Sequence, residues 1–278
     1  GMKTRLITSA VGLIVLAVVL SFFTTPVFNV VLLAISLTAM HEVYAALKLQ
    51  TPAVYLGVIP MTVAVFFLDV HSVPFWLILY ATAVFLGVCV IVRSRTLSFL
   101  SVGGFMLFSA MILACFYSML FLRGAFPRSS DALYFIVLGL GIAWGGDSSA
   151  YFAGRFWGKH KLAPIVSPHK TVEGAVGGVV GSALMALLIS VIYMSVWGQP
   201  DSAVIDLQYY LLVLLTGAVG SVLGILGDLT ASAVKRQNEI KDYGTIFPGH
   251  GGILDRFDSV LFVMPFVALM TMLLVGAA

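Results

Sequence analysis

The sequence predicts an all-α, polytopic integral membrane protein, a helix bundle with about nine transmembrane helices. Hydrophobic residues make up 60% of the 278 residues and charged residues only 10%, whereas soluble domains carry about 25% charged residues. The apolar residues are also grouped in long runs, without the period-2 alternation of membrane barrels. Lipid offers no hydrogen-bond partner to an open backbone, so these runs must be helices.

A helix needs about 20 residues to cross a hydrocarbon core of about 30 Å. The third apolar run is short, so a re-entrant or tilted element is the alternative there. No polar linker divides the chain, and we expect one structural unit. Within it we distinguish an N-terminal part, 1–130, without a recognisable motif and a C-terminal catalytic part, 131–278. The expected spans are 6–23, 27–47, 53–69, 74–93, 98–122, 131–154, 172–197, 208–234 and 257–276.

Lysine and arginine are concentrated in alternate connections, which the positive-inside rule assigns to the cytoplasm. Arg123 and Arg128 are the exceptions, because they fall on the opposite side. The net charge of +3 is modest and does not indicate a nucleic-acid partner. We therefore expect a multi-pass membrane protein with its site facing the cytoplasm. The connections concerned carry Lys3 and Arg5, Lys48, Arg93 and Arg95, the group from Arg155 to Lys170, and the group from Lys235 to Lys241.

Charged residues gather in two segments, 147–173 and 228–258. Together the two segments hold 15 of the 27 charged residues in 58 positions, where an even spread would place about six. Glycine pairs at close-packing spacing occur in the adjoining spans, at Gly177 with Gly181 and at Gly220 with Gly224. Such pairs let helices approach closely, and a dimer contact or a backbone approach to a ligand is the alternative.

Acidic residues in these segments are expected at one membrane depth. A helix that starts near Gln208 and rises about 1.5 Å per residue reaches Asp228 after about 30 Å. The same calculation from Asp131 places Asp147 about 24 Å across the bilayer. Asp255 and Asp258 lie where the last span begins from that side. Ionisable groups at such depth are costly, so a functional site is the default hypothesis.

The spacing within segment 228–258 indicates a metal and phosphate site. Asp228, Ser232 and Lys235 share one helical face with Arg236, and Asp255 and Asp258 are three residues apart. Carboxylates without a histidine or cysteine cluster suit Mg²⁺, which takes oxygen ligands. Lysine and arginine beside them suit phosphates. The alternative is that these charges form structural ion pairs at the ends of helices.

Two loops add candidate binding groups. Phe247 to Gly252 contains three glycines around His250, so the backbone N–H groups can approach a ligand. His250 is expected either to contact phosphate or to hold the loop. In the other segment, Thr171 or Ser167 is a candidate helix N-cap, with Glu173 in the first turn. The functional alternative is an anion site at this helix N-terminus beside Lys170.

The 27 positions from Ser232 to Asp258 resemble the signature of CDP-diacylglycerol synthases, the bacterial phosphatidate cytidylyltransferases, without a departure. The stretches from Asp147 to Arg155 and from Ser167 to Gly174 are also similar to that family. The resemblance implies the reaction of CTP with phosphatidic acid to give CDP-diacylglycerol and pyrophosphate. It also implies Mg²⁺, a second cation that can be K⁺, a homodimer and a location in the bacterial inner membrane.

Carried onto this sequence, the resemblance makes Asp228, Asp255 and Asp258 the expected metal ligands. The wider set of expected catalytic residues consists of Asp228, Lys235, Arg236, Lys241, Asp242, His250, Asp255, Arg256 and Asp258. The expected substrate-binding residues are Asp147, Ser167, Lys170, Thr171, Glu173, Ser232, Gly251 and Gly252. Two alternatives remain: a CTP-dependent lipid kinase of the polyprenol or dolichol type and, in a different class, a secondary transporter. Transporter sites lie near the bilayer midplane in repeated halves, which does not match charges at one face.

Overall fold

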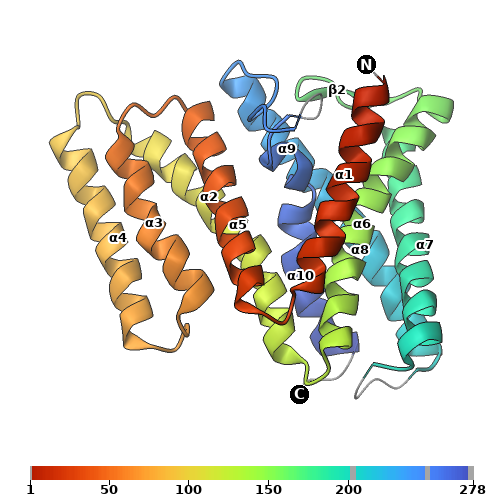
Figure 1. The fold of residues 1–278 in the computed structure, drawn as a ribbon. Coiled ribbons are helices and arrows are strands. Elements are labelled where there is room, and N and C mark those ends of the chain that lie inside the picture. Colours follow the sequence, from red (N-terminus) through yellow and green to blue (C-terminus); the bar gives the residue numbers. More distant parts are fainter. Residues whose placement is uncertain (1, 201–204, 248–250, 275–278) are drawn as a thin grey trace. The chain divides into compact units, whose positions relative to one another are not determined.

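The computed structural model describes residues 2–200, 205–247 and 251–274, with side chains from residue 11 onward. It confirms an all-α membrane bundle (Figure 1). The helices are α1 (Met2–Ser21), α2 (Pro26–Ala46), α3 (Pro52–Phe67), α4 (Val73–Val92), α5 (Phe99–Ala125), α6 (Ser129–Trp157), α7 (Val172–Trp197), α8 (Leu207–Gln237), α9 (Leu254–Phe257) and α10 (Val260–Leu274).

Each expected span corresponds to a helix, but the lengths differ. Six helices of the described part, namely α2 and α4 to α8, are long and apolar enough to cross a membrane. The short third span is α3, which has 16 residues and contains Pro60. The ninth span is divided, because α9 ends at Phe257 and α10 begins at Val260. That division places Asp258 and Ser259 outside the regular helices.

The chain forms two compact units that interleave along the sequence. One unit comprises Gly1–Tyr117 and Asn238–Arg256, and the other comprises Ser118–Gln237 and Phe257–Ala278. We call them the first and the second unit. The segment 238–256 therefore belongs with the N-terminal helices, although its motif residues belong to the predicted catalytic part.

In the first unit, α3 packs between α2 and α4 (Figure 1). Pro26 and Pro52 stand at the starts of α2 and α3, where the missing N–H group costs nothing. The Ser72 hydroxyl caps α4 by accepting the N–H of Phe75 at 3.4 Å. Buried phenylalanine, methionine and valine side chains fill the contacts between these helices, so the unit has its own apolar core.

In the second unit, small residues bring α6, α7 and α8 close together. A Cβ on Gly177 or Gly181 would overlap Ala153 or Ser149 of α6. A Cβ on Gly217 would lie 2.7 Å from the Cα of Ala183, so α7 and α8 also meet at backbone distance. The glycine pair in α7 therefore serves helix packing, as its spacing predicts.

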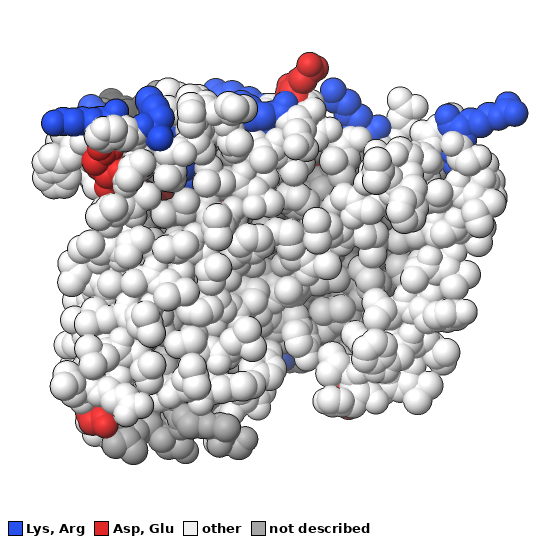
Figure 2. All heavy atoms as spheres, turned by 180° about the vertical axis from the view of Figure 1, so that it is seen from behind, with Lys and Arg blue, Asp and Glu red and all other residues white. Residues whose placement is uncertain are grey.

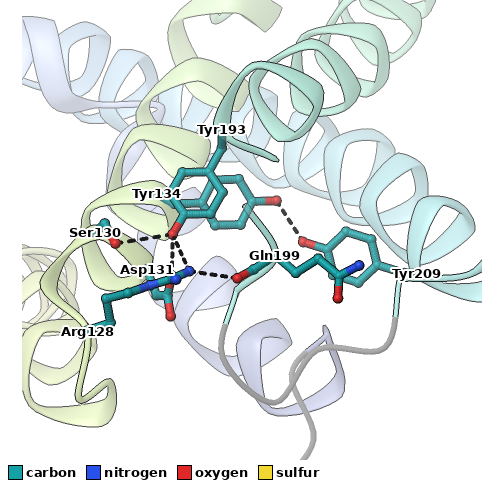
Figure 3. Close-up of polar contacts among 7 residues, drawn as sticks. All are labelled: Arg128, Ser130, Asp131, Tyr134, Tyr193, Gln199 and Tyr209. Carbon is teal, nitrogen blue, oxygen red and sulfur yellow. Dashed lines mark hydrogen bonds and ion pairs between the residues drawn. The ribbon is translucent and has the colours of Figure 1, made fainter. Parts of the chain in front are cut away.

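The N-terminal end of α6 is held by a polar network (Figure 3). Asp131 is fully buried, and its Oδ1 accepts hydrogen bonds from Arg128 Nη2 at 2.6 Å and from the Tyr193 hydroxyl. Arg128 Nη2 also donates to the carbonyl oxygen of Gln199 at 2.7 Å. The network joins the start of α6 to the end of α7 and gives Arg128, an exception to the expected charge distribution, a structural role.

A β-hairpin between α6 and α7 was not among the expected elements. Its strands are β1 (Lys161–Ala163) and β2 (Ser167–Thr171), which pair antiparallel with Lys161 opposite Thr171. Figure 2 shows charged side chains at the ends of the helices, while the visible sides of the helices are almost free of them. This distribution suits helices whose sides face lipid.

Candidate active site

Three carboxylates from separate elements of the second unit form one electrostatic cluster. Asp147 comes from α6, Asp228 from α8 and Asp258 from the residues before α10. Burial, together with the negative charges of Asp228 and Asp147, raises the pKa of Asp258 to about 8. Like charges disfavour ionisation of a neighbouring carboxyl, so Asp258 is close enough to Asp228 and Asp147 for their charges to affect its protonation. We call Asp147, Asp228 and Asp258 the acidic cluster.

Ser259 links two members of the acidic cluster. Its hydroxyl donates to Asp147 Oδ2 at 2.8 Å, and its backbone N–H donates to Asp258 Oδ1 at 2.8 Å. The Ser259 side chain is fully buried. Both carboxylates are therefore fixed by one residue at the break between α9 and α10.

Gly227 allows α8 to approach this break. A Cβ at Gly227 would lie 2.5 Å from the carbonyl oxygen of Asp258. One helical turn earlier, a Cβ at Gly224 would lie 3.3 Å from Val263. Since a backbone carbonyl cannot move aside cheaply, the absence of a side chain at Gly227 is what brings Asp228 beside Asp258.

Two lysines supply positive charge to the acidic cluster. Lys170 of β2 forms an ion pair with Asp228 Oδ2, and both side chains are about one quarter exposed. The charge of Lys235 opposes the upward shift in the pKa of Asp258. The substrate-binding candidate Lys170 and the catalytic candidates Asp228 and Lys235 therefore belong to one site, although 65 residues separate the first from the last.

The residues around Asp228 follow the predicted helical face. The Ser232 hydroxyl donates to Asp228 Oδ1 at 3.1 Å, across one turn of α8. Arg236 Nε donates to the carbonyl oxygen of Val166, next to the candidate Ser167 at the start of β2. The C-terminal end of α8 is thus joined to the hairpin that carries Lys170.

The start of α7 is organised by two further candidates. The Thr171 side chain accepts the N–H of Gly174 at 3.1 Å, so Thr171 and not Ser167 is the N-cap. Glu173 accepts hydrogen bonds from His160 Nδ1 at 2.6 Å and from the N–H of Lys159 at 3.0 Å. In this structure Glu173 therefore fixes the connection between α6 and the hairpin.

The second group of candidates lies in the first unit. We use the term glycine loop for the described residues 243–247 and 251–255. Asp255 Oδ2 accepts the N–H groups of Tyr243 at 2.7 Å and Gly252 at 3.0 Å. Gly251 has a φ of +82°, and Phe247 pairs with it through a β-bridge. His250 lies outside the described residues. Lys241, Asp242 and Arg256 are exposed at the borders of this loop.

Glu42 is the residue of this region that sequence reasoning missed. Its carboxylate accepts the N–H groups of Ile253 and Leu254. The available signal was a glutamate inside the apolar run 27–47, because an ionisable group within a membrane span indicates function by default.

The donors of the acidic cluster fit a hard divalent cation. Carboxylate and hydroxyl oxygens are the ligands that Mg²⁺ prefers, and Asp147, Asp228, Asp258 and Ser259 supply oxygens of both kinds. In the described part of the chain, no three acidic, histidine or cysteine side chains already surround one ion position. Asp228 is instead neutralised by Lys170.

Fold and site together define a multi-pass membrane protein with an acidic and basic site at helix ends. The chain belongs to the cytidylyltransferase family, whose sequence profile matches residues 3–274. It is 36% identical to the phosphatidate cytidylyltransferase of Bacillus subtilis over 275 residues, which is 96% of each chain. The phosphatidate cytidylyltransferases of Staphylococcus epidermidis and Staphylococcus haemolyticus are 43% and 42% identical to it in alignments of 143 and 140 residues, which cover 50% of each chain.

Proposed function

We propose that the acidic cluster transfers the cytidylyl group of CTP to phosphatidic acid, which gives CDP-diacylglycerol and pyrophosphate. The family membership supports the reaction. The observation that carries the assignment to this site is the meeting of Asp147, Asp228 and Asp258 with Lys170 and Lys235. Nucleotidyl transfer depends on positioning and charge stabilisation, and this arrangement provides both.

The proposed metal ligands are Asp228 and Asp258, with Asp147 beside them. Bound Mg²⁺ would neutralise negative charge on the phosphate oxygens of the two substrates. The Ser259 contacts hold Asp147 and Asp258 in place for this role. The sequence-based assignment of Asp255 as a further ligand stays a prediction, as does K⁺ as the second cation.

The cationic residues would bind the triphosphate and the lipid phosphate. Lys170 neutralises Asp228, and an incoming phosphate would compete for its ammonium group. The positive charge of Lys235 opposes the rise in the pKa of Asp258, so Lys235 would stabilise negative charge beside the metal ligands. The lipid phosphate is already anionic, and its attack on the α-phosphorus of CTP needs no strong general base.

We further propose that the site faces the cytoplasm of a bacterial inner membrane, where lysine and arginine accumulate. CTP would arrive from the cytosol while the acyl chains of phosphatidic acid stay in lipid. The homodimer that the family resemblance implies is also a proposal. Cross-linking in native membranes would test it.

The reaction is tested with CTP labelled at either the α- or the γ-phosphorus, with phosphatidic acid as acceptor. We expect the α-label in the lipid product and the γ-label in released pyrophosphate. A lipid kinase would instead transfer the γ-label to a polyprenol and release CDP. Transfer of the γ-label, or no transfer to phosphatidic acid, would contradict the proposal. For Asp→Asn variants of the acidic cluster in this assay, Asp69→Asn is the matched control, since Asp69 is an exposed carboxylate in a turn after α3.

A further inference from the structure

Glu42 lies in the last turns of α2 and is buried, with 5% of its surface exposed. Its Oε1 accepts the N–H of Ile253 at 2.9 Å, and its Oε2 accepts the N–H of Leu254 at 2.8 Å. Each carboxylate oxygen therefore accepts a hydrogen bond from one of two consecutive residues, and both residues lie more than 200 positions after Glu42 in the sequence. Hydrogen bonds to an ionised acceptor are stronger than neutral ones, so this contact fixes the backbone of the glycine loop.

Two glycines of the loop make room for this carboxylate. A Cβ at Gly244 or at Gly252 would overlap Glu42 Oε1. The loop therefore approaches Glu42 with bare backbone on both sides of the contact. A larger residue at either position would displace the carboxylate from its two donors.

Asp255 holds the same loop from within. Its Oδ2 accepts the N–H groups of Tyr243 and Gly252, while Glu42 accepts those of the next two residues. Three consecutive N–H groups, from Gly252 to Leu254, thus end on two carboxylates. The position of the Asp255 carboxylate is coupled through this backbone to Glu42.

We propose that Glu42 is a positioning residue for the reaction. It acts through the glycine loop, which carries Asp255 and continues after three residues to Asp258. This inference rests on the proposed function, because it assigns the loop a part in cytidylyl transfer. It also gives the N-terminal half of the chain, which has no recognisable motif, a defined contact with the glycine loop.

The test replaces Glu42 by glutamine and by aspartate. Glutamine keeps the shape of the side chain but has only one acceptor oxygen. Its NH₂ group would face a backbone N–H, and two donors cannot form a hydrogen bond with each other. Aspartate is shorter but keeps two acceptor oxygens. We expect Glu42→Gln to lower kcat/KM by about 10- to 100-fold, as for other residues that orient a ligand. We expect Glu42→Asp to retain more activity than Glu42→Gln.

Hydrogen exchange of the amides of Ile253 and Leu254 is the second readout. In Glu42→Gln these amides should exchange about tenfold faster or more, while α6 to α8 keep their protection. Gly252→Ala should speed the same exchange from the other side of the contact. Asp69→Asn is the control, because its carboxylate also accepts a backbone N–H but in an exposed turn. It should change neither exchange in the loop nor activity.

The two readouts separate the possible failures. Unchanged exchange in both Glu42→Gln and Gly252→Ala would overturn the role of Glu42 in holding the loop. Faster exchange with full activity would overturn the role of the loop in the reaction, while the structural contact would stand. Glu42→Gln as active as Glu42→Asp would show that side-chain shape matters and not the number of acceptors, which also contradicts the inference. If Glu42→Gln does not accumulate, Gly252→Ala decides by its exchange and its activity together: faster exchange with reduced activity supports the proposal, and unchanged exchange or full activity overturns it.

Discussion

The hydroxyl of Ser259 donates a 2.8 Å hydrogen bond to Asp147 Oδ2, which joins the break before α10 to α6 across 112 residues of sequence. The same residue donates its N–H to Asp258 Oδ1. One serine therefore determines the separation of two carboxylates that we propose to act at a metal site.

Replacement of Ser259 by alanine should weaken magnesium binding without removing a proposed ligand. A hydrogen bond to a charged group contributes about 1.5 to 3 kcal/mol, so the Mg²⁺ concentration for half-maximal activity should rise by about tenfold or more. Ser195→Ala is the control, because the Ser195 hydroxyl is exposed and bonds only within α7 in the described contacts. An unchanged magnesium requirement in Ser259→Ala would contradict the role of Ser259 in positioning Asp147 and Asp258 for metal binding.

Gly227→Ala should damage the site by overpacking. The added methyl group would lie 2.5 Å from the Asp258 carbonyl oxygen, and strain of this kind costs about 1 to 3 kcal/mol. We expect a lower melting temperature in detergent and reduced transfer activity. Gly87→Ala in α4 is the matched control, since no atom lies within 4 Å of its added Cβ. Equal stability and activity of the two variants would contradict the close approach of α8.

Loss of Arg128 should reduce stability much more than catalysis. Arg128→Met removes the partly exposed guanidinium that pairs with the fully buried Asp131, and a buried charge that loses its partner destabilises the fold. Asp131 and Asp147 are 16 residues apart on α6, which corresponds to about 24 Å. Thermal denaturation should therefore show a clear loss, with an unchanged KM for CTP at low temperature. The control is Arg95→Met, in an exposed turn. A raised KM for CTP in Arg128→Met would show that the Arg128–Asp131 network affects the active site, which contradicts our expectation that the two are independent.

Magnesium activation should depend on pH through Asp258. Its pKa is raised to about 8, so at neutral pH a proton competes with the cation, and metal binding releases that proton. The Mg²⁺ concentration for half-maximal activity should fall as pH increases from about 6.5 to about 8.5. The free energy of unfolding of the metal-free protein should fall as pH rises from the ordinary aspartate pKa to about 8. In this range the folded state binds more protons than the unfolded state. A magnesium requirement independent of pH would contradict the clustering of carboxylates.

The membrane bundle was predictable because lipid permits so few solutions. Apolar runs must become helices, and their lengths follow from bilayer thickness, so the start of α7 at Val172 agrees with the expected span. The rise per residue predicts one membrane depth for Asp147, Asp228, Asp255 and Asp258, and this shared depth stays a prediction. The prediction of the helices succeeds because it depends on distances along single helices.

Contacts between segments without a shared periodicity were not predictable. The hairpin of β1 and β2 is too short and too polar to give a strand pattern. The break at Asp258 has no proline or glycine to mark it, since α9 and α10 are separated only by Asp258 and Ser259. The contact of Glu42 with the glycine loop joins α2 to a segment 211 residues away, and one sequence contains no signal for such a pairing.

The central claim is that the carboxylates of the acidic cluster carry out magnesium-dependent cytidylyl transfer. The most direct measurement is the initial rate of α-label transfer from CTP to phosphatidic acid, as a function of Mg²⁺, in Asp228→Asn and Asp258→Asn. Both variants should accumulate as folded protein and lose about 100-fold or more of the rate at saturating CTP. Near-normal rates in both variants, with an unchanged magnesium requirement, would contradict the account.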